Sequence, residues 1–183
     1  LFAIGETTNF FELDVTLYDP SGQLLSTTSG TNTGFRVDTL NLASSGTYTY
    51  VVREANALND GNYTLTATVI DATIDADNVA LTSGQTESGF ITFGDIDTFT
   101  IDADAGDDLL FVINETTSFF ALDVALYGPN GQLIETQTGI ETGVRLDTFD
   151  LATSGTYTYV VREASALNDG GYSLTAVVAD ATV

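Results

Sequence analysis

Six aspartates in the second half of the chain form its densest group of side chains able to do chemistry: Asp95, Asp97, Asp102, Asp104, Asp107 and Asp108. Calcium prefers hard oxygen ligands, and a turn such as 102–108 can present several carboxylates while Gly106 lets the backbone bend toward an ion. The loop spacing and terminal Glu of an EF-hand are missing. If these six residues hold a metal ion we expect it to be calcium, and the favoured alternative is a solvated acidic turn without an ion.

Three more aspartates, Asp71, Asp75 and Asp77, lie just before this group. Two of them fall in the acidic segment 72–78, which we interpret as a linker. A calcium ion bound there would stiffen the connection between its neighbours.

The residue types that are missing exclude many functions. The 183 residues contain 26 acidic side chains, four arginines and no Cys, His, Lys, Met or Trp, so the net charge is -22. Without Cys, His or Lys there is no thiolate nucleophile, Ser-His-Asp triad or Schiff base. Such an acidic surface repels nucleic acid and anionic lipid, and the longest apolar run, 109–113, is far too short to cross a bilayer. We expect neither nucleic-acid binding nor membrane insertion.

Catalysis by carboxylates alone needs only two acids, so the missing residue types do not exclude it. The Asp-Thr-Gly of aspartic proteases is not matched, because Leu40 and Phe149 stand where Gly would be required after Asp38-Thr39 and Asp147-Thr148. We expect no enzyme, no catalytic residue and no cofactor other than calcium.

The four cations are Arg36, Arg53, Arg145 and Arg162. Since a guanidinium pairs well with carboxylate oxygens, we expect each to be held in a structural ion pair. A sugar- or carboxylate-binding role is the alternative. The candidate acidic partners are Asp14, Asp38, Asp123 and Asp147.

Four tyrosines alternate along two segments and could stack on sugars or pack across strands: Tyr48, Tyr50, Tyr157 and Tyr159. Packing is the favoured interpretation, because period-two aromatic residues usually contact neighbouring strands.

These residues recur because the sequence repeats itself. Sliding the chain by 109 places residues 1–74 on residues 110–183 with 50 identities in 74 pairs, about 68%. Residues 46–55 recur unchanged at 155–164. A period this long fits whole domains, each with its own core, rather than a solenoid.

Strand signals fill the period. Leu122, Val124 and Leu126 alternate with other residues, as in a half-buried strand, and similar runs recur between Gly, Asn, Asp or Pro turns. We predict an all-β chain of tandem antiparallel β-sandwich domains, jelly-roll-like, with about nine short strands per 109-residue period. The strands expected in one period are 79–81, 91–93, 98–101, 109–113, 122–127, 132–136, 145–149, 156–163 and 172–178.

The order of several short motifs between residues 79 and 180 resembles the bacterial pre-peptidase C-terminal (PPC) domain family. The motifs are Leu81-Thr-Ser-Gly84, Ser88-Gly89-Phe90-Ile91, Gly94-Asp95-Ile96-Asp97-Thr98-Phe99-Thr100, Ala105-Gly106-Asp107, Leu122 to Gly131, Ser154-Gly155-Thr156-Tyr157 and Gly171-Tyr172-Ser173-Leu174. The resemblance implies a small β-sandwich that acts as an extracellular accessory module. Relatives include collagen- and carbohydrate-binding modules, some of them calcium-bound.

The repeat and the resemblance together predict the domain organisation. Residues 1–71 are expected to be an incomplete first sandwich, 72–78 a linker, 79–181 a complete sandwich, and 182–183 the start of the next linker. The missing opening strands would lie upstream in a longer product or be donated by a neighbouring subunit.

We therefore expect a non-catalytic extracellular or cell-surface module, a spacer or assembly unit of an adhesin or fibre. Its partners would be neighbouring copies of itself or adjacent repeats. The alternative is a calcium-dependent carbohydrate- or protein-binding accessory module of a secreted hydrolase, with a polysaccharide as the candidate ligand.

Overall fold

The computed structural model describes residues 2–8, 12–30, 34–37, 42–67, 69, 79–118, 121–140, 143–165 and 168–180. The chain divides into two compact units, unit 1 (Leu1–Thr68) and unit 2 (Val69–Val183), and each is described by itself. The expected linker, 72–78, and residues 182–183 lie outside the described residues. The described part contains strands and no helix, so it has no helix suited to crossing a membrane.

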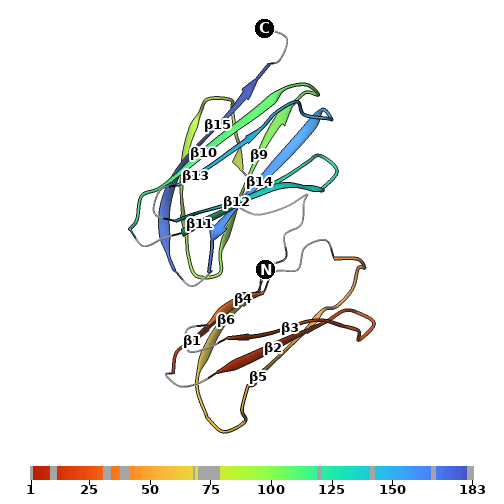
Figure 1. The fold of residues 1–183 in the computed structure, drawn as a ribbon, viewed down its shortest axis with the longest axis vertical. Helices are drawn as coiled ribbons and strands as arrows, with labels where there is room; N and C mark the ends of the chain where they lie inside the picture. Colours follow the sequence, from red (N-terminus) through yellow and green to blue (C-terminus); the bar gives the residue numbers. More distant parts are fainter. Residues whose placement is uncertain are drawn as a thin grey trace. The chain divides into compact units, whose positions relative to one another are not determined.

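Unit 1 contains six described strands in two three-stranded antiparallel sheets (Figure 1). The strands are β1 (Phe2–Glu6), β2 (Leu13–Tyr18), β3 (Leu24–Gly30), β4 (Phe35–Val37), β5 (Thr49–Glu54) and β6 (Tyr63–Ala67). One sheet has the order β4-β1-β6 and the other β3-β2-β5. Alternate residues of β1 and β2, among them Ile4 and Val15, form a small core with Val37.

Unit 2 contains nine described strands in a four-stranded and a five-stranded sheet (Figure 1). They are β7 (Val79–Ala80), β8 (Thr86–Ile91), β9 (Ile96–Ala103), β10 (Asp108–Glu115), β11 (Ala121–Tyr127), β12 (Leu133–Ile140), β13 (Val144–Thr148), β14 (Gly155–Glu163) and β15 (Gly170–Ala179). The sheet orders are β13-β10-β15-β8 and β12-β11-β14-β9-β7. All pairings are antiparallel except that of β7 with β9. Side chains of both sheets share one core, so unit 2 is a β-sandwich.

The all-β prediction is confirmed, and one expected strand is displaced. A strand was expected at 91–93, but β8 ends at Ile91, and residues 92–95 form a turn closed by the Asp95 amide donating to the Thr92 carbonyl at 3.0 Å. Gly94 has a φ of +70°, which L side chains rarely adopt, so the turn forms at this glycine. The apolar run around Ile91 marked the end of a strand rather than its centre.

The strands of unit 1 correspond, at the 109-residue offset, to the last six strands of unit 2. Thus β1 matches β10, β2 matches β11, and β5 and β6 match β14 and β15. Unit 2 has three further strands, β7, β8 and β9, ahead of this shared set. The described part of unit 1 has no equivalent of them.

Candidate functional site

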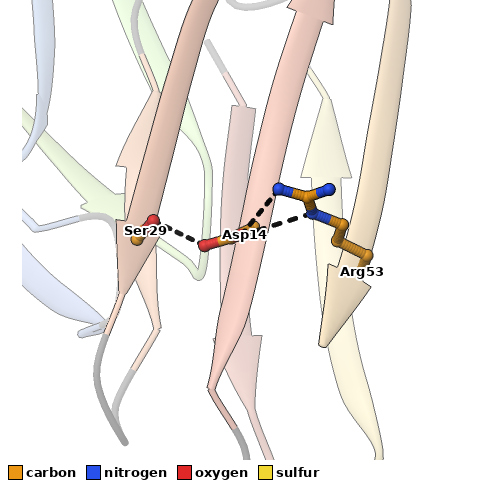
Figure 2. A network of polar contacts seen from close by, with 3 residues as sticks. All are labelled: Asp14, Ser29 and Arg53. Carbon is orange, nitrogen blue, oxygen red and sulfur yellow. Dashed lines mark hydrogen bonds and ion pairs between the residues drawn. The ribbon is translucent and has the colours of Figure 1, made fainter. Parts of the chain in front are cut away.

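A row of three polar side chains joins three neighbouring strands of unit 1. In register, Asp14 on β2 lies opposite Ser29 on β3 and Arg53 on β5. Nε and Nη2 of Arg53 donate to Oδ2 of Asp14 at 3.3 and 3.1 Å, and the Ser29 hydroxyl donates to Oδ1 at 2.5 Å (Figure 2). The pKa of Asp14 is lowered by the Ser29 hydrogen bond and by Arg53, while burial opposes the shift. Both carboxylate oxygens are therefore engaged as acceptors.

The same row occurs in unit 2 with Thr in place of Ser. Asp123 on β11 accepts hydrogen bonds from Arg162 Nε at 2.8 Å and from the Thr138 hydroxyl at 2.9 Å. Arg162 Nη2 lies 2.6 Å from the same carboxylate. Here the Arg162 side chain is 8% exposed, whereas that of Arg53 is 65% exposed. Ile96 on β9 lies opposite Arg162 in register, and this neighbour has no described counterpart in unit 1.

The ion-pair prediction is confirmed for three of the arginines. Besides Arg53 and Arg162, Arg145 on β13 donates through Nε to Asp147 at 2.7 Å. Arg36 occupies the equivalent position on β4, and Asp38 lies outside the described residues. The Arg53 and Arg162 pairs join neighbouring strands and so brace their sheets, whereas the Arg145 pair lies within β13.

The six aspartates predicted to hold calcium are divided among separate hydrogen bonds. Asp95 accepts from the Ile96 amide at 2.9 Å, and Asp97 accepts from the Tyr172 hydroxyl. Asp108 accepts from the Asp150 amide at 2.9 Å. No three acidic side chains within the described ranges are placed to share one ion. As placed they do not fit a metal site, and calcium binding stays a prediction.

Three of these aspartates line the same surface concavity, although they are not placed to share one ion. Asp102, Asp104 and Asp107 line a shallow concavity of about 400 Å³ with Ser154 and Gly155. The expected turn is present: the Asp107 amide donates to the Asp104 carbonyl at 3.1 Å, and Gly106 has a φ of +93°. However, Oδ2 of Asp107 accepts from the Asp104 amide at 2.9 Å. The Asp107 carboxylate is thus engaged in a hydrogen bond within its own turn. This arrangement is the one expected for a solvated acidic turn.

The tyrosines of unit 2 pack inside the sandwich. Tyr157 and Tyr159 are buried, and the Tyr159 ring stacks on Phe111 with centroids 4.1 Å apart. The Tyr157 hydroxyl donates to the Thr153 carbonyl at 2.6 Å. Burial raises the pKa of Tyr159, and Asp147 and Glu135 raise it further, so its phenol stays neutral. The packing interpretation is confirmed here, because buried rings cannot stack on a sugar.

A contact between the two sheets of unit 2 was not anticipated from the sequence. The Tyr172 hydroxyl on β15 donates to Asp97 on β9, and the Tyr172 ring meets the edge of Phe99 with centroids 6.2 Å apart. Gly89 on β8 lies opposite Tyr172, and a side chain there would collide with the ring. The only sequence signal is Gly89 within a strand of larger residues, which suggests a close approach.

No protein-family model matches the sequence, and no curated protein matches it. Among solved structures, the periplasmic inhibitor of g-type lysozyme from Aeromonas hydrophila is similar, with 18% identity and a TM-score of 0.46. That match covers 55% of this chain and 95% of the inhibitor. The pre-peptidase C-terminal domain of a Bacillus anthracis collagenase has 17% identity and a TM-score of 0.45, and the match covers 56% of this chain and 97% of the domain. The Salmonella Typhimurium lysozyme inhibitor has 22% identity and a TM-score of 0.40, with 56% and 99% covered.

Proposed function

We propose that this chain is a non-catalytic structural module of an extracellular or cell-surface protein, such as an adhesin stalk or fibre, and works as a spacer or assembly unit. The observation that supports this most directly is that six strands of one unit recur in the other at a 109-residue offset, with the same Asp-Arg-hydroxyl row in each unit. What is repeated is thus a device that joins strands.

The composition supports an external location. With four cations, all of them arginine, the chain offers few sites to trypsin-like proteases, and without Cys or Met it lacks the side chains that oxidise most easily. Both properties suit a protein that persists outside the cell. Partners would be neighbouring copies or adjacent repeats.

Electron microscopy of the native material, labelled with an antibody raised against the full chain, tests this function. We expect label on the cell exterior, spaced along a filament or stalk. Label confined to the cell interior would contradict the proposal. An unrelated cytoplasmic antigen, labelled in parallel, controls for access of the antibody.

The second candidate is a calcium-dependent carbohydrate- or protein-binding module of a secreted hydrolase. It is favoured by one feature, the concavity that Asp102, Asp104 and Asp107 line. Glycan-array binding with calcium, lost with a chelator and lost in Asp104→Asn/Asp107→Asn, would support it. An array without signal under both conditions would leave the spacer function.

Calcium also has a test that needs no ligand. If the ion is structural, about 1 mM calcium should raise the unfolding midpoint of unit 2 above that in equimolar magnesium, since extracellular calcium modules bind at about this concentration. The variant Asp104→Asn/Asp107→Asn should remove the difference. A midpoint that a chelator leaves unchanged would reject the structural ion.

A further inference from the structure

Two strands of unit 1 have fewer neighbours than their counterparts in unit 2. Within the described part of unit 1, β5 pairs with β2 and β6 pairs with β1, and each has no second partner strand. In unit 2 the matching β14 lies between β11 and β9, and β15 lies between β10 and β8. Among its described residues, unit 1 therefore presents two strand edges whose counterparts within unit 2 are paired with a further strand.

Apolar side chains beside the β6 edge are exposed for the same reason. Tyr63 is 43% exposed and Leu65 is 47% exposed, whereas the identical residues of unit 2, Tyr172 and Leu174, are each 1% exposed. Because the residue types are the same, the difference comes from what covers them. We call the surface formed by the β5 and β6 edges and their exposed apolar side chains the open face of unit 1.

The β5 side of the open face shows the same contrast. Val51 is 44% exposed, and its counterpart Val160 is 1% exposed and lies opposite Thr98 of β9. Leu42 is exposed, and its counterpart Leu151 is buried in the core of unit 2. Exposed apolar side chains beside an unpaired strand edge are a template for strand addition.

The structure also shows what fills the equivalent place. In unit 2, β8 pairs with β15 and β9 pairs with β14, and they add Ile91, Phe99 and Ile101 to the shared core. Asp97 of β9 accepts the hydroxyl hydrogen bond of Tyr172. The segment 79–103 thus provides unit 2 with partner strands, an apolar cover and a hydrogen-bond acceptor. The open face of unit 1 is shaped by the same residue types that receive them.

We propose that the open face of unit 1 is an acceptor for a strand segment of the 79–103 type, which it can take when that segment is linked to β1 as residues 79–103 are linked to β10. This deepens the proposed function, on whose assembly role it rests, by naming the occupant and its register. In that register, the position of Phe99 lies opposite Tyr50, and the position of Gly89 lies opposite Tyr63, as they do opposite Tyr159 and Tyr172.

Strand exchange between two copies is disfavoured because it does not increase the number of covered faces. The described chain has one segment of this type, and unit 2 already holds it with its core side chains buried. Giving it to unit 1 of another copy would open the face of unit 2, so the number of covered faces would not change. An additional segment covers unit 1 without this loss.

Hydrogen exchange on two full-length proteins tests the proposal. One is the 183-residue chain, and the other carries a second copy of residues 73–109 fused ahead of Leu1. We expect exchange of the amides in β5 and β6 to slow by about 100-fold in the fusion, because strands inside a sheet exchange only when the sheet opens. The control fusion carries Phe99→Asp and Ile101→Asp in the added copy alone, and its β5 and β6 should exchange as in the unfused chain.

The possible results distinguish an unfolded sample, an accepted segment and a second copy as the occupant. Exchange in β14 and β15 of every sample reports that the chain is folded. Equal exchange of β5 and β6 in the folded fusion and the unfused chain would overturn the proposal. So would an unfused chain whose β5 and β6 are already protected in proportion to its concentration and which sediments as an oligomer, since the occupant would then be a second copy. Neither result bears on cellular location, so the proposed function is tested separately by the antibody label.

Discussion

At the scale of single residues, the equivalent Asp14–Arg53 and Asp123–Arg162 pairs share their chemistry and differ in their surroundings. Asp123 and Arg162 are both almost fully buried, while Arg53 is largely in water. Surface pairs contribute little because solvent screens them, whereas breaking a buried pair leaves a charge without compensation. The same substitution should therefore have different effects in the two units.

Arg162→Ala should lower the free energy of unfolding of unit 2 by about 3–5 kcal/mol, since it strands Asp123 in a buried site. Arg53→Ala, the matched control, should cost unit 1 about 1 kcal/mol or less. Urea unfolding followed by tyrosine fluorescence measures both. Equal costs would show that the difference in burial has no energetic consequence.

Glu6 offers a prediction with a pH dependence. Burial raises the pKa of Glu6 and the nearby Glu12 raises it further, while the Leu13 amide lowers it. A carboxyl whose folded pKa lies above its unfolded value favours folding below the unfolded pKa, and that contribution is lost as pH rises through the folded pKa. Glu6→Gln should therefore raise the unfolding midpoint of unit 1 at pH 7 and leave it nearly unchanged near pH 4.

Calorimetry at the two pH values measures this effect. Asp60→Asn, which removes an exposed loop carboxylate of unit 1, is the control. A gain from Glu6→Gln that is equal at both pH values would contradict the assignment to ionisation.

At the scale of strands, close packing of β8 on β15 depends on a residue without a side chain. A Cβ built on Gly89 would lie 2.2 Å from the Tyr172 hydroxyl oxygen and 2.3 Å from Cζ of the same ring. That ring is buried and bonded to Asp97, so it has little freedom to move. The glycine thus sets the separation of the two strands.

Gly89→Ala should lower the free energy of unfolding of unit 2 by about 1–3 kcal/mol, the usual cost of overpacking a filled core. Ser88→Ala, an exposed change in the same strand, should have little effect. Denaturant titration of both variants measures the difference. If the two variants were equally stable, the Tyr172 ring would have to shift freely.

At the scale of the whole molecule, the net charge of -22 dominates the response to solvent. Repulsion among like charges favours the expanded chain, and salt shortens its range from about 30 Å at 0.01 M to about 8 Å at 0.15 M. Both units should therefore be more stable at the higher ionic strength.

Calorimetry at 0.01 M and 0.15 M sodium chloride should show higher midpoints for both unfolding transitions in the saltier buffer. A variant with several exposed Asp and Glu residues changed to Asn and Gln should respond less. A midpoint that falls with salt would mean that the ion pairs, which salt weakens, outweigh the repulsion.

The sequence by itself determined most of the strands of this protein and indicated the ion pairs of three of its arginines. Strands follow from period-two alternation and from glycine- and proline-containing turns, which are local properties, and the recurrence of Arg53 and Asp14 as Arg162 and Asp123 pointed to the ion pairs before any contact was known. The position of β8 was missed because an apolar run around Ile91 does not reveal on which side of the turn at Gly94 the strand lies.

Only the tertiary structure decided which surfaces are covered and where the carboxylates are engaged. Tyr63 and Tyr172 have the same neighbours in sequence at many positions, yet Tyr63 is largely exposed and Tyr172 is buried. The burial of Tyr172 depends on β8 and β9, which precede the strands that the two units share. Likewise the aspartates between 95 and 108 are close in sequence, but several bond to nearby backbone amides or to other strands. Carboxylates that are close along the chain do not necessarily point to one place. The hydrogen bonds that each carboxylate forms in the folded sheet determine where it points.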